Sequence, residues 1–288
     1  MPLRPIALVP LIALAASLLM SAQVTGATGG RASATEPDEA NPCTGTHAGR
    51  LRCPDLQMGT PANLTLDRYE GRVVLRAGNN LKNRGEGPVM LRGRRNGSRT
   101  MSARQHIYRQ DGSRLVERTG ARLFFKYVEG QGHYWKWQDA ARFELWSLRP
   151  DGSRNELVRS GPKVHYCLRD LARTSPSKNS PRGRVFPGCS KDPGKREVTL
   201  GTSAGWSDVY PAAYYQQWID VTGLRGCFAY VHRADPKNHV WENFEGNNDA
   251  QRIVRLPWRG AARGCPGSGR SIPEPIASPP GGGGYQTL

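Results

Sequence analysis

Short runs of β-forming residues, separated by turn residues, constrain the fold of this chain more than any other feature. Val89–Arg92, Arg142–Arg149 and Cys227–His232 are typical runs, and glycine, proline, aspartate or asparagine stands between consecutive ones. Asn96-Gly97 and Asp111-Gly112 have the composition of tight turns. No convincing amphipathic helix of about ten residues or more is present. The pattern predicts an all-β fold, a β-sandwich with long loops.

The two ends of the 288-residue chain differ from its middle. Residues 1–27 combine Arg4, an apolar segment and small residues before a cleavage site, which predicts a secretory signal peptide. Residues 28–41 are polar and without periodicity, and we interpret them as a linker. Residues 266–288 are rich in proline and glycine and predict a disordered tail. We therefore expect a secreted β-sandwich domain over residues 42–265, with no membrane span after signal removal.

Six cysteines in an exported chain indicate three disulfides. Cys167 and Cys189 flank a Ser/Pro/Lys/Arg loop, which predicts a bond between them. Cys43 and Cys53 are close enough in sequence for a local loop, and Cys227 and Cys265 then remain. A zinc site built from four cysteines is the competing interpretation, but no Cys-x-x-Cys occurs in the chain.

The net charge of +17 restricts the kinds of partner that the chain attracts. Outside a cell, such a surface draws anionic polymers, phospholipid headgroups or acidic proteins. We expect anionic cell-surface or extracellular polymers or proteins as partners. Nucleic acid is not expected, because no helix-turn-helix, zinc finger or aromatic RNA-binding motif is found. The basic residues are spread along the chain, so a solvated basic surface is the simpler interpretation.

Three blocks of sequence occur in an order that indicates a family. They are Arg72-Val73-Val74-Leu75-Arg76 with Leu81-Lys82-Asn83-Arg84-Gly85, Lys163-Val164-His165-Tyr166-Cys167-Leu168-Arg169-Asp170, and Asp208-Val209-Tyr210 with Gln217-Trp218-Ile219-Asp220-Val221-Thr222. Singly, they read as a strand with a turn, a strand end with half of a disulfide, and a surface strand entering a turn. Together they resemble the catalytic domain of the lysyl oxidases, over about residues 64–255. Glu242-Asn243 and Asn247-Asn248 fit the family's Asn-rich stretch before its last strand.

The resemblance implies a specific chemistry. Lysyl oxidases are copper-dependent and oxidise the ε-amino group of peptidyl lysine to an aldehyde, releasing ammonia and hydrogen peroxide. Their cofactor is a tyrosine that is oxidised to a quinone and crosslinked to a lysine of the same chain. By motif position, Lys163 resembles the crosslinking lysine and Tyr210 the quinone tyrosine. The resemblance therefore implies that the two lie close together on neighbouring strands. Without it, Lys163 would be read as solvated and Tyr210 as structural.

The copper site is where this sequence departs from the family. The family's ligands are His-x-His-x-His on a strand, a spacing that aims three imidazoles at one metal. Here the three ligand positions fall on Gly132, Tyr134 and Lys136, which we expect to face the Lys163 and Tyr210 pair. A register shifted by one residue gives His133, Trp135 and Trp137, with a single imidazole. Neither set makes a copper site, and the two tryptophans are expected in the core.

The other histidines are scattered, and no two have i, i+2 spacing. They are His47, His106, His165, His232 and His239. The first hypothesis is a secreted lysyl oxidase-like protein whose copper site is lost, non-catalytic or binding, without the family's copper and lysine tyrosylquinone. The second is an active copper and quinone amine oxidase with a non-standard ligand set. The third is an unrelated β-sandwich module that binds anionic cell-surface polymer. The sequence leaves open whether the chain is an enzyme.

Overall fold

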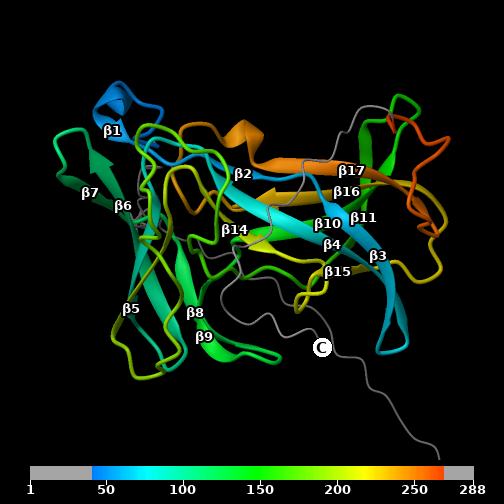
Figure 1. Ribbon diagram of the computed structural model, residues 1–288, viewed down its shortest axis with the longest axis horizontal. Coiled ribbons are helices and arrows are strands. Elements are labelled where there is room, and N and C mark those ends of the chain that lie inside the picture. The colour runs from blue at the N-terminus through cyan, green and yellow to red at the C-terminus, as the bar shows by residue number, and fades with distance from the viewer. Residues whose placement is uncertain (1–40, 269–288) are drawn as a thin grey trace, which may run out of the picture. The chain divides into compact units, whose positions relative to one another are not determined.

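The computed structural model in Figure 1 describes residues 41–268. The expected signal peptide, nearly all of the expected linker and the tail beyond Ser268 lie outside the described residues. Within residues 41–268 the regular structure is β-strands and two 3-10 turns, η1 (Ala48–Arg50) and η2 (Glu245–Asn247). No helix in this range is long and apolar enough to cross a membrane.

Seventeen strands build the described part of the chain. They are β1 (Leu51–Arg52), β2 (Leu56–Met58), β3 (Ala62–Tyr69), β4 (Arg72–Asn83), β5 (Val89–Arg95), β6 (Thr100–Arg109), β7 (Arg114–Glu117), β8 (Arg122–Val128), β9 (Gly132–Trp137), β10 (Ala141–Leu148), β11 (Arg154–Ser160), β12 (Ala172–Arg173), β13 (Glu197–Thr202), β14 (Trp206–Tyr210), β15 (Trp218–Asp220), β16 (Gly226–Ala234) and β17 (Asp249–Leu256). The all-β fold expected from the sequence is confirmed.

The strands form three sheets, and their pairings are antiparallel. The first has the order β13-β5-β6-β8-β9, with β1 and β7 also on β6. The second has the order β11-β10-β16-β17. The third has the order β12-β14-β4-β15, with β2 and β3 also on β4. In Figure 1, β4 crosses the centre of the view, with β5 to β9 at one end and β3 and β11 at the other.

Four local expectations were wrong. Arg72–Arg76 and Leu81–Gly85 do not form a strand and a turn, because β4 runs unbroken from Arg72 to Asn83. Lys163–Leu168 is a loop with one isolated bridge rather than a strand. In the second half of the third block, Gln217–Thr222, regular pairing is limited to β15, and turns occupy the residues before it. Strand β14 is buried along its whole length, so it is not a surface strand.

Alternating side chains fill two main cores. One includes Leu91, Met101, Leu123, Trp135 and Trp137, and both tryptophans are fully buried as expected. The other gathers residues from β4, β10, β15, β16 and β17, namely Leu75, Phe143, Ile219, Tyr230 and Val254. This first core also includes Tyr134, Tyr166, Tyr210 and Tyr214, so it continues past β9 into the candidate site.

Three disulfides form with the pairing expected from the sequence. They join Cys43 to Cys53, Cys167 to Cys189, and Cys227 to Cys265. Asp170 also holds the loop that follows the second block, since its carboxylate accepts hydrogen bonds from the backbone of Ser203 at 2.7 Å and of Val185 at 2.9 Å. This loop is consequently attached at both ends.

Candidate functional site

Lys163 and Tyr210 meet in the interior of the protein. Tyr210 ends β14 and its side chain is fully buried, and Lys163 is 2% exposed in the segment after β11. The Lys163 Nζ atom lies 3.9 Å from the centre of the Tyr210 ring. The proximity that the resemblance implies is confirmed. The expectation that both residues lie on strands is wrong for Lys163, which lies in a loop.

Two backbone contacts hold Lys163 in place. Before it, the chain passes so close to β15 that a Cβ atom on Gly161 would lie 2.4 Å from the Trp218 carbonyl oxygen. After it, Tyr166 and Trp137 exchange backbone hydrogen bonds of 2.7 and 3.1 Å in an isolated bridge. Only a residue without a side chain fits the first contact. The loop that carries Lys163 is therefore fixed to β9 and β15.

Three tyrosine rings surround the Lys163 amine. Its Nζ atom lies 3.9 Å from the ring centre of Tyr210, 4.2 Å from that of Tyr214 and 4.9 Å from that of Tyr166. In the described part of the chain this nitrogen has no hydrogen-bond partner. Burial, followed by the charge of Lys136, lowers the pKa of Lys163 well below its usual value. Burial therefore favours the neutral amine of Lys163 over its ammonium form.

A second buried lysine lies beside the first. Lys136, on β9, is 2% exposed, and its Nζ atom is 5.0 Å from the ring centre of Tyr134 and 5.8 Å from that of Tyr214. Burial lowers the pKa of Lys136 to about 7, although the negative charge of Asp208 acts in the opposite direction. The charge of Lys136 in turn disfavours the protonated form of Lys163.

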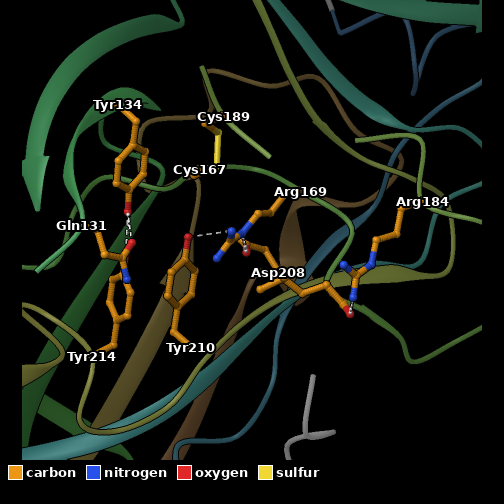
Figure 2. Close-up of polar contacts among 10 residues, drawn as sticks. Gln131, Tyr134, Cys167, Arg169, Arg184, Cys189, Asp208, Tyr210 and Tyr214 are labelled. Carbon is orange, nitrogen blue, oxygen red and sulfur yellow. Dashed lines mark hydrogen bonds and ion pairs between the residues drawn. A yellow bond between two sulfur atoms is a disulfide. The ribbon is translucent and has the colours of Figure 1, made fainter. Parts of the chain in front are cut away.

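Asp208 is the buried acid of the cluster. It shares a face of β14 with Tyr210, whose hydroxyl donates a hydrogen bond of 2.8 Å to Asp208 Oδ2 (Figure 2). Arg169 Nε lies 3.7 Å from the other carboxylate oxygen. Burial raises the pKa of Asp208 to about 7, and the guanidinium of Arg169 opposes this rise. A carboxylate at this position can accept the Tyr210 proton, although burial also raises the pKa of Tyr210.

The Tyr134 hydroxyl is hydrogen-bonded to another tyrosine, so it is not available as a metal ligand. Its hydroxyl lies 2.5 Å from that of Tyr214, and both point toward Gln131 Oε1, at 3.2 and 3.3 Å (Figure 2). Both rings are nearly buried. Tyr134 therefore serves the packing between β9 and the turn that follows β14.

The residues at the family's ligand positions do not fit copper. Gly132 has no side chain, Tyr134 is engaged with Tyr214, and Lys136 places a basic amine next to that of Lys163. Cu(II) favours several neutral imidazole donors, and nearby positive charge disfavours a cation. In residues 41–268, no group of three or more His, Cys, Asp or Glu side chains is arranged to hold a metal ion.

The histidines do not supply another ligand set near Lys163. His133 lies on the opposite face of β9 and stacks on Phe125, with ring centres 5.5 Å apart. His165 packs edge-on against Phe124 at 5.8 Å, and burial lowers its pKa to about 4. His165 is close enough to Lys163 for the lysine charge to lower its pKa further. The other four lie in the segment before η1, on β6, on β16 and between β16 and η2, and they are His47, His106, His232 and His239.

Several residues of the cluster were not identified from the sequence. Asp208 stands two residues before Tyr210, a spacing that predicts a shared face once the segment is known to be a strand. Tyr166 lies inside the second block, three residues after Lys163. Tyr214 and Gln131 carry no comparable signal, because tertiary packing alone brings them together.

A separate buried polar cluster surrounds Glu242, which is fully buried between β16 and η2. The Asn248 side-chain amide donates to Glu242 Oε1 at 2.8 Å and to Glu245 Oε2 at 3.1 Å, and the Leu56 backbone amide also donates to Glu242. Burial, followed by the charge of Glu245, raises the pKa of Glu242 to about 9. Through these hydrogen bonds Glu242 connects β2 to the segment before β17.

Comparisons of the chain with models of known protein families and with curated proteins find no match.

Proposed function

We propose that this protein is a lysyl oxidase-like protein that has lost copper-dependent amine oxidation. The observation that carries the proposal is the position of Lys136. A basic side chain occupies a ligand position of the family, beside a second buried lysine and three tyrosines. The three sequence blocks and the contact between Lys163 and Tyr210 support the family resemblance, and the three disulfides fit an exported protein.

The amines and phenols in the cluster then act as packing groups. Lys163 fills the space between the rings of Tyr166, Tyr210 and Tyr214, where burial disfavours its charged form. The Tyr210 phenol keeps its proton, because burial raises its pKa and Asp208 accepts its hydrogen bond. Oxidation of the ring to a quinone needs an oxidising metal held beside it, and the side chains at the ligand positions do not provide one.

The experiment is copper loading followed by an assay of peroxide release. Purified protein is incubated with Cu(II), dialysed, analysed for metal and mixed with an alkylamine under air. The expected result is copper well below one per chain and no amine-dependent peroxide. One copper per chain together with amine-dependent peroxide would favour the active oxidase with a non-standard ligand set. Copper without peroxide would contradict the loss of metal binding while leaving the protein non-catalytic.

A further inference from the structure

One face of the first sheet is exposed over β5, β6 and the start of β8, and it carries arginines in register across these three strands. Arg92 lies directly opposite Arg104, the partner of Arg92 on β6. Arg94 lies opposite Ser102, which is in turn opposite Arg122 on β8. The four arginines are exposed, whereas the residues that alternate with them on β5, β6 and β8 are buried. We call Arg92, Arg94, Arg104 and Arg122 the arginine face.

The arginine face keeps an excess of positive charge. Like charges directly opposite each other on a sheet are destabilising. Their effect reaches His106 on β6, whose pKa is lowered by burial and then by the charges of Arg114, Arg92 and Arg104. Glu197 on β13 forms an ion pair with Arg92 at 2.5 Å. Glu117 pairs with buried Gln105, on the opposite side of the sheet from Arg104. The Glu197 carboxylate therefore offsets part of the charge of the four guanidinium groups.

Neutral polar side chains lie among the arginines. Ser102 separates Arg94 from Arg122, and its hydroxyl accepts a hydrogen bond of 2.6 Å from the Asn96 amide. Thr199 on β13 lies opposite Arg92. Phe124 lies on the same face of β8 as Arg122, but it is partly buried and the Arg99 guanidinium lies 5.2 Å from its ring centre. The exposed apolar side chain nearest in register is Val116 on β7, opposite His106. Hydroxyl and amide groups between guanidinium groups suit a ligand that combines anionic groups with hydroxyls.

We propose that the arginine face binds a sulfated polysaccharide. Planar guanidinium groups bind oxyanions through two parallel hydrogen bonds. Successive arginines on a strand are about 6.8 Å apart and neighbouring strands about 4.8 Å apart, so a linear chain can contact several at once. A single-stranded nucleic acid would need exposed rings for base stacking, and a lipid surface would favour apolar side chains that insert into it. This binding is independent of whether Lys163 and Tyr210 have any chemistry.

The test compares two variants of equal charge. The face variant carries Arg→Gln at Arg92, Arg94, Arg104 and Arg122. The control variant carries Arg→Gln at four exposed arginines on β3, on β11, before β16 and after β17, namely Arg68, Arg159, Arg225 and Arg259. Binding to immobilised heparin is measured at near-physiological salt for the full chain and both variants. Desulfated heparin and single-stranded DNA serve as competitors, and circular dichroism with thermal unfolding checks the fold.

We expect the face variant to lose affinity for heparin by about tenfold or more, and the control variant to change by about twofold or less. A third variant carries Arg→Lys at the four face positions, which keeps the charge but removes the planar guanidinium groups. We expect its loss of heparin affinity to be intermediate. Equal losses in the face and control variants would show that only net charge matters, and no loss in either would exclude the face. Either outcome overturns the proposal. The proposal would also be overturned if single-stranded DNA competed as strongly as heparin does, or if desulfated heparin competed as strongly as heparin does.

Discussion

The Lys163 Nζ atom lies 3.9 Å from the centre of the Tyr210 ring, and burial lowers the pKa of this lysine well below its usual value. A lysine whose pKa is lower in the folded protein than its ordinary value of 10.5 binds fewer protons when folded. Its contribution to stability is therefore present above pH 10.5 and is lost as the pH falls below this value.

The first prediction follows from this linkage. Lys163→Met keeps the length of the side chain and removes the amine, so it should raise the free energy of unfolding at pH 7 by about 1 kcal/mol or more. The gain should shrink toward pH 10. Urea denaturation at both pH values measures it. A large loss of stability at pH 7 would mean that the charged ammonium has a stabilising partner in the folded state.

The second prediction concerns Glu242. Its pKa rises from 4.5 to about 9 on folding, so its contribution to stability is present below pH 4.5 and is lost as the pH rises toward 9. Between pH 6 and pH 8, the free energy of unfolding of the Glu242→Gln variant should fall by about 1–2 kcal/mol less than that of the parent protein. The exposed Glu156→Gln is the matched control and should follow the parent. Parallel stability profiles for all three proteins would show that Glu242 is ionised in the fold.

The third prediction concerns the copper positions. Gly132→His, Tyr134→His and Lys136→His together should raise the affinity for Cu(II), because they create three imidazoles on one face of β9. The structure adds an expected penalty at Gly132, where φ is +80°, although the space around its Cβ position is open. Histidine at this position should cost about 1 kcal/mol of stability. Calorimetric titration with copper, with the double variant lacking the Gly132 change as control, measures both effects. Copper affinity that stays at the level of the parent protein would show that β9 does not face a metal-sized site.

The fourth prediction concerns the Cys167–Cys189 bond, whose cysteines are 22 positions apart. Replacing both by alanine should lower stability by about 3 kcal/mol. The segment that directly follows Cys189 supports β9, since Trp135 donates to the Ser190 and Asp192 carbonyl oxygens at 3.0 and 3.1 Å. Hydrogen exchange at the Trp135 amide should therefore accelerate more than in a variant lacking the Cys43–Cys53 bond. Equal exchange rates at the Trp135 amide in both variants would show that the Cys167–Cys189 bond does not support β9.

The sequence predicted those features that depend on local pattern. Turn residues between short apolar runs indicated an all-β fold, and alternation on β9 separated Trp135 and Trp137 from Tyr134 and Lys136. Spacing along the chain also indicated the Cys167–Cys189 bond. These features were predictable because each depends on a few neighbouring residues and the side-chain period of a strand.

Features set by tertiary contacts were not predictable in the same way. The run from Lys163 to Leu168 has the composition of a strand, but the chain is held by Gly161 against Trp218 and by one bridge at Tyr166. Likewise, nothing in the sequence near Lys136 indicates that it is buried. Its burial results from β14 and the turn containing Tyr214, which cover the polar face of β9.

Peptide mapping by mass spectrometry tests most directly whether copper chemistry is lost at Lys163 and Tyr210. The full-length protein is first incubated with Cu(II) under air. Proteolysis should release Lys163 and Tyr210 on separate, unmodified peptides, because no metal is held beside the ring to oxidise it. The triple histidine variant provides the comparison sample with imidazoles at the ligand positions. A branched peptide that joins Lys163 to Tyr210 in the parent protein, with quinone absorbance in the native state, would contradict the proposed function.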